Sequence, residues 1–147
     1  PWPFALPWTA DGTGFSKPFI GDRALLDVQD PRYTYAFVGS DLRKVSTRDP
    51  AIFLNALGED IGRVLTCVSD MGIGYANKQI FSIASPGRPE GFKPRGLCCG
   101  FIKVNEQLET GSQVQLKDKR RTITVTIVDD IRPDRTARRL ISEMVQD

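Results

Sequence analysis

Histidine is absent from this chain of 147 residues, and its absence narrows the chemistry that the side chains can do. Histidine is the side chain that titrates near neutral pH, and it is the commonest metal ligand. Nucleophilic catalysis of the Ser–His or Cys–His kind is therefore excluded, apart from unusual lysine-based variants. The sequence also lacks a P-loop and a dinucleotide fingerprint, because "GIG" at 72–74 is only a two-glycine fragment. These patterns indicate no catalytic residue.

The three cysteines are the next candidates for chemistry: Cys67, Cys98 and Cys99. An odd number without a secretory segment indicates free thiols in a reducing compartment, which predicts a cytoplasmic protein. The paired CxxC groups of a structural zinc site are absent, so we expect no metal site and interpret the thiols as small buried hydrophobes. Because neighbours in a strand point to opposite faces, Cys98 and Cys99 should not both lie in the core.

Charged groups offer two further candidate sites. Asp129 and Asp130 directly follow a predicted strand, where functional loops often begin, but adjacent carboxylates there are mostly solvated turn residues. The segment "KDKRR" at 117–121 is typical of a charged hairpin tip, and this favours a solubilising role over an anion site.

An arginine group follows in "IRPDRTARR", which includes Arg132 and Arg135. Arginine binds carboxylate or phosphate in a bidentate manner, so this group could hold the anionic tail of a ligand. A solvated helix face with intrachain pairing is the simpler interpretation. The group lacks the interleaved aromatic residues on which single-stranded nucleic acids stack, and a net charge of +2 is mild, so we expect no nucleic-acid partner.

Length and composition describe one domain that can bury its own core. Hydrophobic residues at 40% and charged residues at 26% are ordinary for a soluble globular protein. No apolar run approaches the roughly 18 residues of a membrane span, so we expect no membrane partner. The opening "PWPFALPW" is typical of an extended tether, from which we expect the chain to be a fragment of a longer protein.

Strands dominate the predicted elements, and the clearest is "RTITVTIVD" at 121–129, where Ile123, Val125 and Ile127 alternate with threonines. Further strands are expected at 33–38, 52–60, 61–68, 97–104 and 112–116. The strand at 52–60 should break at Gly58, and a hairpin through "LGEDIG" at 57–62 is the alternative there. Residues 69–79 are predicted as loop, 80–84 as a strand or helical turn, and the Pro- and Gly-rich 85–96 as loop.

Two helices complete the prediction. Asp22 should cap or open a short helix that continues to about Val28. Near the end of the chain, Asp134 can cap an amphipathic helix whose apolar residues follow i, i+3, i+4 spacing. Those residues are Ala137, Leu140, Ile141, Met144 and Val145.

Three segments in order resemble one enzyme family. "SKPFIGDRALL" at 16–26 resembles the "K-x-D-F-I-G-x-x-A-L" segment of the folate-dependent aminomethyltransferases, the glycine cleavage T-protein and its relatives, and "FALPW" precedes it as an apolar stretch ending in Trp does in that family. "GEDIGRVLTCVSD" is similar to the family's "G-x-x-I-G-x-V-T-S-G" strand. "LCCGFIKVNEQLETGSQVQLKDKRRTITVTIVD" is similar to its "I-A-L-A-Y-V-P…G-T-x-L-x-V-x-I-R-G-K…A-x-V-V" ending. The resemblance covers about residues 4–130.

The resemblance implies a Greek-key β-barrel-like domain preceded by a connector. Together with the residue patterns above, this predicts a mainly β protein with an N-terminal connector helix and a C-terminal amphipathic helix, although that last helix replaces the family's usual ending. The expected division is a connector at 1–30, the barrel at 31–131 and the helix at 132–147. Such a barrel ends a transferase that moves a one-carbon unit from an amine or methyl donor to tetrahydrofolate. The family's catalytic Asp would lie upstream of Pro1, so this chain would hold no catalytic residue of its own.

The resemblance also implies the ligands and partners. Tetrahydrofolate would be the cofactor, and Lys17, Arg132 and Arg135 are the candidate folate-binding residues, because cations suit a carboxylate tail. The partners would be the upstream folate-binding domain of the same chain and a lipoyl carrier protein. Three alternatives stay open: a non-catalytic docking module of the same fold, a folate-dependent demethylase, and a nucleic-acid-associated relative that uses the arginine group.

Overall fold

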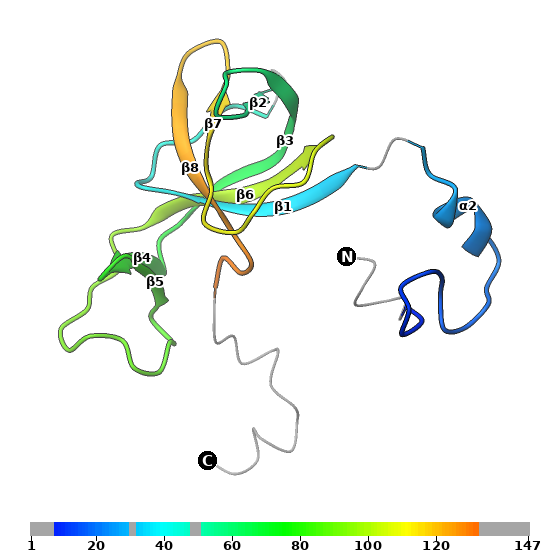
Figure 1. Cartoon of the computed structure of the whole chain (residues 1–147). Coiled ribbons are helices and arrows are strands. Elements are labelled where there is room, and N and C mark those ends of the chain that lie inside the picture. Colours follow the sequence, from blue (N-terminus) through cyan, green and yellow to red (C-terminus); the bar gives the residue numbers. More distant parts are fainter. Residues whose placement is uncertain (1–7, 30–31, 48–50, 133–147) are drawn as a thin grey trace.

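Six strands close into an antiparallel barrel in the computed structural model, which describes residues 8–29, 32–47 and 51–132 (Figure 1). Around the barrel the order is β1-β6-β3-β2-β7-β8, and β8 pairs back with β1. Strands distant in sequence are neighbours, as in Greek-key barrels. The mainly β fold with a closed barrel is therefore confirmed. The barrel strands are β1 (Tyr33–Gly39), β2 (Ile52–Leu54), β3 (Asp60–Asp70), β6 (Leu97–Val104), β7 (Gln113–Lys117) and β8 (Thr122–Val128).

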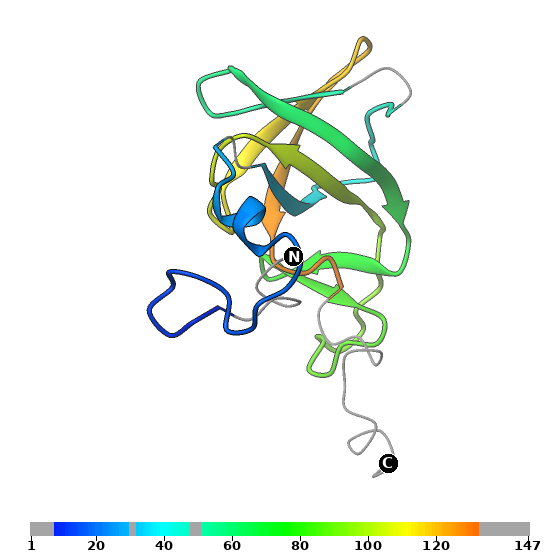
Figure 2. The ribbon, with the colours of Figure 1, turned by 90° about the vertical axis from the view of Figure 1, so that its right-hand side faces the viewer.

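Alternating side chains fill the barrel, as the sequence pattern of β8 requires. Ile123, Val125 and Ile127 are buried in the interior, and the threonines between them face outward. On β7 the same alternation buries Val114 and Leu116. The largest interior side chains are two phenylalanines, Phe37 and Phe53, both fully buried. Figure 2 shows the closed wall from the side.

Two glycines make room for bulky neighbours inside the barrel. A Cβ atom on Gly100 would overlap the backbone oxygen of Thr66 and crowd the ring of Phe37. A Cβ atom on Gly39 would overlap Cys98 Sγ, while its other neighbours lie 3.7 Å away. The missing side chains therefore let Phe37 and Cys98 occupy the interior at native packing density.

A short hairpin outside the barrel corrects the prediction that residues 69–79 form a loop. β4 (Ile73–Ala76) pairs with β5 (Gln79–Ser82) in a separate two-stranded sheet, left of the barrel in Figure 1. Asn77 and Lys78 connect the strands with positive φ values of 50° and 64°. Two successive residues of this kind form the turn that a two-residue hairpin requires. The polar "ANKQ" segment hid the hairpin, because Lys is not a typical turn residue.

The hairpin covers a second hydrophobic cluster, which we call the outer cluster: Val38, Ile73, Leu97 and Cys99, with Ile80, Val128 and Ile131 packed against them. This cluster explains why the expectation about two cysteines is wrong. Cys98 points into the barrel and Cys99 points out, yet their exposed fractions are 1% and 4%. Both are buried because this stretch of β6 has a covered outer face. All three cysteines are free thiols.

The connector helix forms where it was predicted but ends two residues earlier. α2 (Asp22–Leu26) begins after its N-cap residue Gly21, which has a φ of 95°, and no hydrogen bond from the N-cap side chain caps the helix. The helix buries none of its residues and lies apart from the barrel, beyond the start of β1 (Figure 1). A small aromatic group precedes it, because Trp8 and Phe15 form one antiparallel bridge and Phe15 also contacts Phe19.

The remaining predictions divide into those that the structure describes and those that it does not. The strands at 33–38, 61–68, 97–104, 112–116 and 121–129 are confirmed to within one or two residues at each end. The segment expected as a strand at 52–60 is β2 followed by a turn over 55–59. Residues 85–96 contain neither helix nor strand, as expected. The C-terminal helix and its cap Asp134 lie outside the described residues.

None of the helices described in the structure has the length and apolarity needed to cross a membrane.

The contact between Gly39 and Cys98 generates a stability prediction. Gly39→Ala should lower the free energy of unfolding by about 1–3 kcal/mol, because the new methyl group overlaps Cys98 Sγ in a packed core. In a Cys98→Ala background the same substitution should cost less than about 1 kcal/mol, since the overlapping atom is gone. Urea unfolding of the wild type, the two single variants and the double variant gives the four free energies of this double-mutant cycle. An equal cost of Gly39→Ala in both backgrounds would contradict the packing of Gly39 against Cys98.

Candidate functional site

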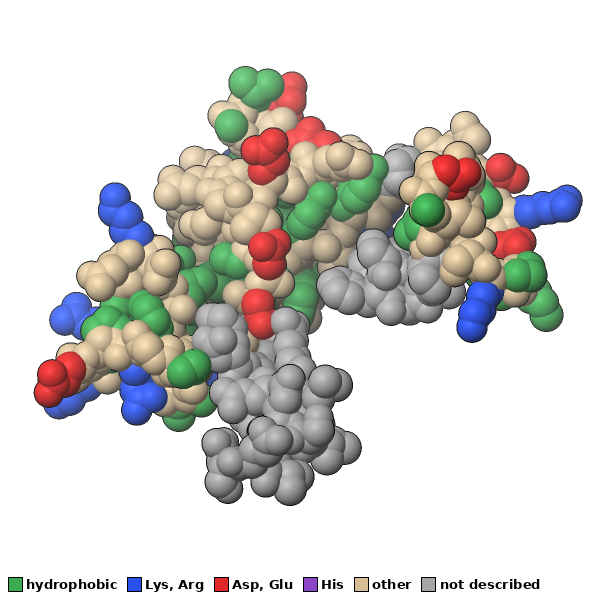
Figure 3. Space-filling view, turned by 60° about the horizontal axis from the view of Figure 1, so that its bottom comes forward, with side chains coloured by type: hydrophobic (Ala, Val, Ile, Leu, Met, Phe, Trp, Pro, Cys, Tyr) green, Lys and Arg blue, Asp and Glu red, His purple; other side chains and the backbone are tan. Residues whose placement is uncertain are grey.

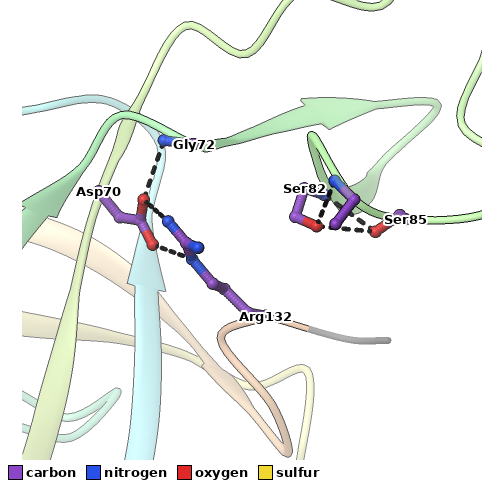
Figure 4. A network of polar contacts seen from close by, with 6 residues as sticks. Asp70, Gly72, Ser82, Ser85 and Arg132 are labelled. Carbon is purple, nitrogen blue, oxygen red and sulfur yellow. Dashed lines mark hydrogen bonds and ion pairs between the residues drawn. The ribbon is translucent and has the colours of Figure 1, made fainter. Parts of the chain in front are cut away.

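Arg132 forms a bidentate ion pair with Asp70 (Figure 4). Arg132 Nε donates to Asp70 Oδ2, and Arg132 Nη2 donates to Asp70 Oδ1, each at 2.5 Å. Gly72 N donates to the same Oδ1 at 2.9 Å. The pair joins the segment after β8 to the corner between β3 and β4, and its two residues are 62 positions apart in sequence. It thereby holds the segment after β8 against the outer cluster.

The ion pair determines what Arg132 can offer a ligand. Hydrogen bonding to Asp70 raises the pKa of Arg132, so the guanidinium stays charged. The side chain is 40% exposed, and that of Asp70 is 17% exposed. Two guanidinium nitrogens already serve the carboxylate, and this matches the interpretation of the arginine group as intrachain pairing.

Among the described residues, no hydrogen bond or ion pair brings the other candidate folate residues to Arg132. Lys17 is an exposed residue of the N-terminal segment, between the Trp8–Phe15 bridge and α2. Arg135 lies outside the described residues. Lys17 and Arg132 therefore come from different parts of the fold.

Asp129 and Asp130 stabilise turns. Thr110 Oγ1 donates to Asp129 Oδ1 at 2.6 Å, and Arg132 N donates to Asp130 Oδ1 at 3.1 Å. These contacts tie the two carboxylates to local structure at the end of β8, where solvated turn residues were expected.

Two buried serines in Figure 4 are also structural. Ser82 N donates to Ser85 Oγ at 3.0 Å, and Ala84 N donates to Ser82 Oγ at 3.1 Å. The two hydroxyl oxygens lie 3.3 Å apart. These bonds satisfy the backbone where β5 ends, as Ser side chains commonly do in turns. No acid or base completes a catalytic arrangement with them among the hydrogen bonds of the described residues.

A basic cleft at one end of the barrel is a candidate site that the sequence does not indicate. It has a volume of about 1060 Å³ and lies between three segments: 40–46 after β1, 93–97 before β6, and 118–121 at the β7–β8 tip. Tyr75 of β4 lines it as well. Six cationic side chains surround it: Arg43, Lys44, Lys93, Arg95, Arg120 and Arg121. In Figure 3, Lys and Arg side chains gather at the end of the molecule that carries the β4–β5 hairpin.

Antiparallel pairing explains why these segments meet. β1 has β6 on one side and β8 on the other, and both run antiparallel to it. The end of β1 therefore lies beside the beginnings of β6 and β8. Cys98 N donates to Asp41 O at 2.6 Å and holds the loop after β1 against the start of β6. The sequence signal was present in "DLRK", "KPR" and "KDKRR", but only barrel closure shows that the three basic segments converge.

Cys67 lies in the barrel core and is influenced by Lys44 and Val45, which line the cleft. A hydrogen bond with the buried Cys98 thiol, a backbone hydrogen bond from Val45 and the charge of Lys44 lower the pKa of Cys67 to about 7. The same thiol contact and burial raise the pKa of Cys98 above its ordinary value. Both sulfurs belong to the barrel core, which agrees with their interpretation as buried hydrophobes.

Within residues 8–29, 32–47 and 51–132, no three Cys, Asp or Glu side chains gather closely enough to hold a metal ion.

Neither a protein-family model, nor a curated protein, nor a solved structure matches this chain.

The Asp70–Arg132 pair generates a prediction that also has an internal control. A double-mutant cycle with Asp70→Asn and Arg132→Gln should give a coupling of about 1 kcal/mol, the upper end for partly exposed ion pairs, because the carboxylate is mostly buried. The pair Asp41–Arg43, at 2.7 Å with both side chains exposed, should give a smaller coupling. Raising the salt concentration should weaken the Asp70–Arg132 coupling. Equal couplings for the two pairs would contradict a special role for the buried carboxylate.

Proposed function

We propose that this chain is the C-terminal barrel domain of a tetrahydrofolate-dependent aminomethyltransferase or methyltransferase. The observation that carries the proposal is where the family-like segments fall in the fold. "FIGDRALL" contains α2, "GEDIGRVLTCVSD" contains β3, and the last segment contains β6, β7 and β8. Segments that resemble the family thus supply the connector helix and four of the six barrel strands.

The pairing of β3 with β6 adds support. These two strands carry the second and third family-like segments, and they pair from Gly62–Val104 to Asp70–Leu97 in the most extensive strand contact of the barrel. Gly62 belongs to the "I-G" of the second segment, and a Cβ atom there would overlap the backbone oxygen of Lys103. The resemblance therefore coincides with a physical requirement of the barrel wall.

In this proposal the chemistry resides upstream of Pro1. The upstream domain would supply the carboxylate that orients or deprotonates the substrate amine while the one-carbon unit passes to tetrahydrofolate. The barrel would complete the enzyme and would be inactive alone. The connector has the surface that such an arrangement needs, because Ile20 is fully exposed and Leu26 and Val28 are about half exposed. These apolar side chains would pack against the upstream domain.

Lys17 and Arg132, with Arg135, are the residues proposed to meet the carboxylate tail of the folate. Arg132 is held in place by Asp70, so its guanidinium is oriented before any ligand arrives. A preorganised cation loses less conformational entropy when it binds a carboxylate. A lipoyl carrier protein remains the proposed donor partner of the complete enzyme, and a folate-dependent demethylase would use the same barrel and the same cofactor.

A docking module is the second candidate, and the exposed connector favours it. Trp8, Phe15 and Phe19 form an aromatic group that is not part of the barrel core, and Trp8 is 41% exposed. The same apolar surface that would contact an upstream domain could contact a separate protein. In this case the protein would bind no folate.

The mass of the endogenous protein separates the two candidates. An antibody raised against this chain should detect a protein far larger than 16.4 kDa in the source cells, because the proposal requires an upstream folate-binding domain. Tetrahydrofolate should raise the melting temperature of the endogenous protein after its purification, since a ligand that binds only the folded state stabilises that state. A band at 16.4 kDa would favour the docking module.

Variants of the complete protein test the folate residues. Arg132→Ala combined with Arg135→Ala should weaken tetrahydrofolate about ten-fold or more, because charge-assisted contacts to the carboxylates are lost. Asp70→Asn is the comparison variant: it removes the ion pair but keeps the Arg132 side chain, so it should weaken tetrahydrofolate less than the double variant does. If Asp70→Asn weakens folate as much as the double variant does, Arg132 has a structural role only.

A further inference from the structure

The basic cleft contains an excess of positive charge that the fold does not neutralise. It is lined by six cations but only two carboxylates, Asp41 and Asp118. The whole chain carries a net charge of only +2, so the positive charge is concentrated here and the rest of the chain is net negative. Such a concentration raises the local potential and attracts anions.

Both carboxylates of the cleft are occupied by hydrogen bonds from the loops that line it. Asp41 accepts from Arg43 N at 2.7 Å and from Arg43 Nε at 2.8 Å. Asp118 accepts from Ser46 N, Arg120 N and Arg121 N at 2.7–2.8 Å. These hydrogen bonds hold the pKa of each carboxyl below its usual value, so both are ionised and already satisfied at neutral pH.

The three backbone donors to Asp118 have a second consequence. The bond from Ser46 N holds the β7–β8 tip against the loop after β1, two segments that are 72 residues apart in sequence. The side chains of Arg120 and Arg121 are left outside this network and are exposed. In the part of the chain that the structure describes, Lys44, Lys93, Arg95 and these two arginines have no carboxylate within ion-pair distance. Asp118 therefore organises the site without cancelling it.

The floor and wall of the cleft are less polar. Leu42, Val45 and Leu97 line it between the charged side chains. Tyr75 is 40% exposed and also lines the cleft. A planar apolar group could lie against its ring while its charged groups reach the cations.

We propose that the cleft binds an oligophosphate group, either free or as part of a nucleotide. The volume of about 1060 Å³ suits a ligand of nucleotide size. Four of the six cations are arginines, whose planar fork matches phosphate oxygens in a bidentate manner. Several cations around one space favour a ligand with closely spaced negative charges over a single carboxylate. The inference is independent of the folate proposal, since it uses other residues.

The test is calorimetric titration of the 147-residue chain with inorganic triphosphate and with ATP at physiological ionic strength. Arg95→Gln combined with Arg121→Gln should weaken triphosphate about ten-fold or more, because two charge-assisted contacts are lost. Arg23→Gln combined with Arg63→Gln is the matched control, since both residues are exposed, lie outside the cleft and remove the same charge. The control should change affinity less than about two-fold, because distant exposed charges are screened.

The two probes identify the source of the phosphate. Tighter binding of ATP than of triphosphate indicates a nucleotide whose ring contacts Tyr75, and equal binding indicates an oligophosphate alone. Both results support the site.

Four results would overturn the proposal. One is the absence of triphosphate binding at millimolar concentration, and a second is an equal loss of affinity in the cleft and control variants. Another is tighter binding of tetraglutamate than of triphosphate, which would make the ligand a polycarboxylate. The last is tighter binding of an oligothymidylate of about twelve nucleotides with steep salt dependence, which would make the cleft a single-stranded nucleic-acid surface.

Discussion

The antiparallel pairing of β1 with both β6 and β8 is the constraint on which the rest of this structure depends. The register from Ala36–Val128 to Gly39–Val125 closes the barrel, and closure leaves no unpaired edge in the sheet. Closure also fixes which loops share an end. The segments at 40–46, 93–97 and 118–121 meet because their strands pair around β1, so the basic cleft follows directly from the sheet topology.

The outer cluster is the second consequence of this arrangement. β6 is buried on both faces near its beginning, with Cys98 inside the barrel and Cys99 beneath the β4–β5 hairpin. The chain leaves β8 at Val128, packs Ile131 on the same cluster, and is fastened to Asp70 through Arg132. One end of the barrel thus carries both the packed outer cluster and the basic cleft. The outer cluster supports the loops that line the cleft.

The sequence predicts β7 and β8 well because they carry a period-two pattern on one buried face, as Ile123, Val125 and Ile127 do. Strands without this alternation, such as β1, are indicated by their aromatic and β-branched residues. The sequence fails for β4, where glycine and polar residues hide a hairpin whose turn uses Asn77 and Lys78. It also fails for the burial of Cys99, because nothing local indicates that a hairpin covers β6. The cleft was beyond sequence reasoning for a related reason. Each basic loop is an ordinary solvated loop by itself, and only long-range pairing brings Arg95 and Arg121 to one space.

The central claim is that one end of the barrel is a single preorganised anion site assembled from three distant segments. The most direct measurement is a titration of the ¹⁵N-labelled chain with triphosphate, followed by amide chemical shifts. We expect amides of the three cleft segments to shift together along one binding curve, while those of Lys17 and Arg23 stay in place. Shifts confined to one segment, or spread over exposed cations everywhere, would contradict a site built by barrel closure.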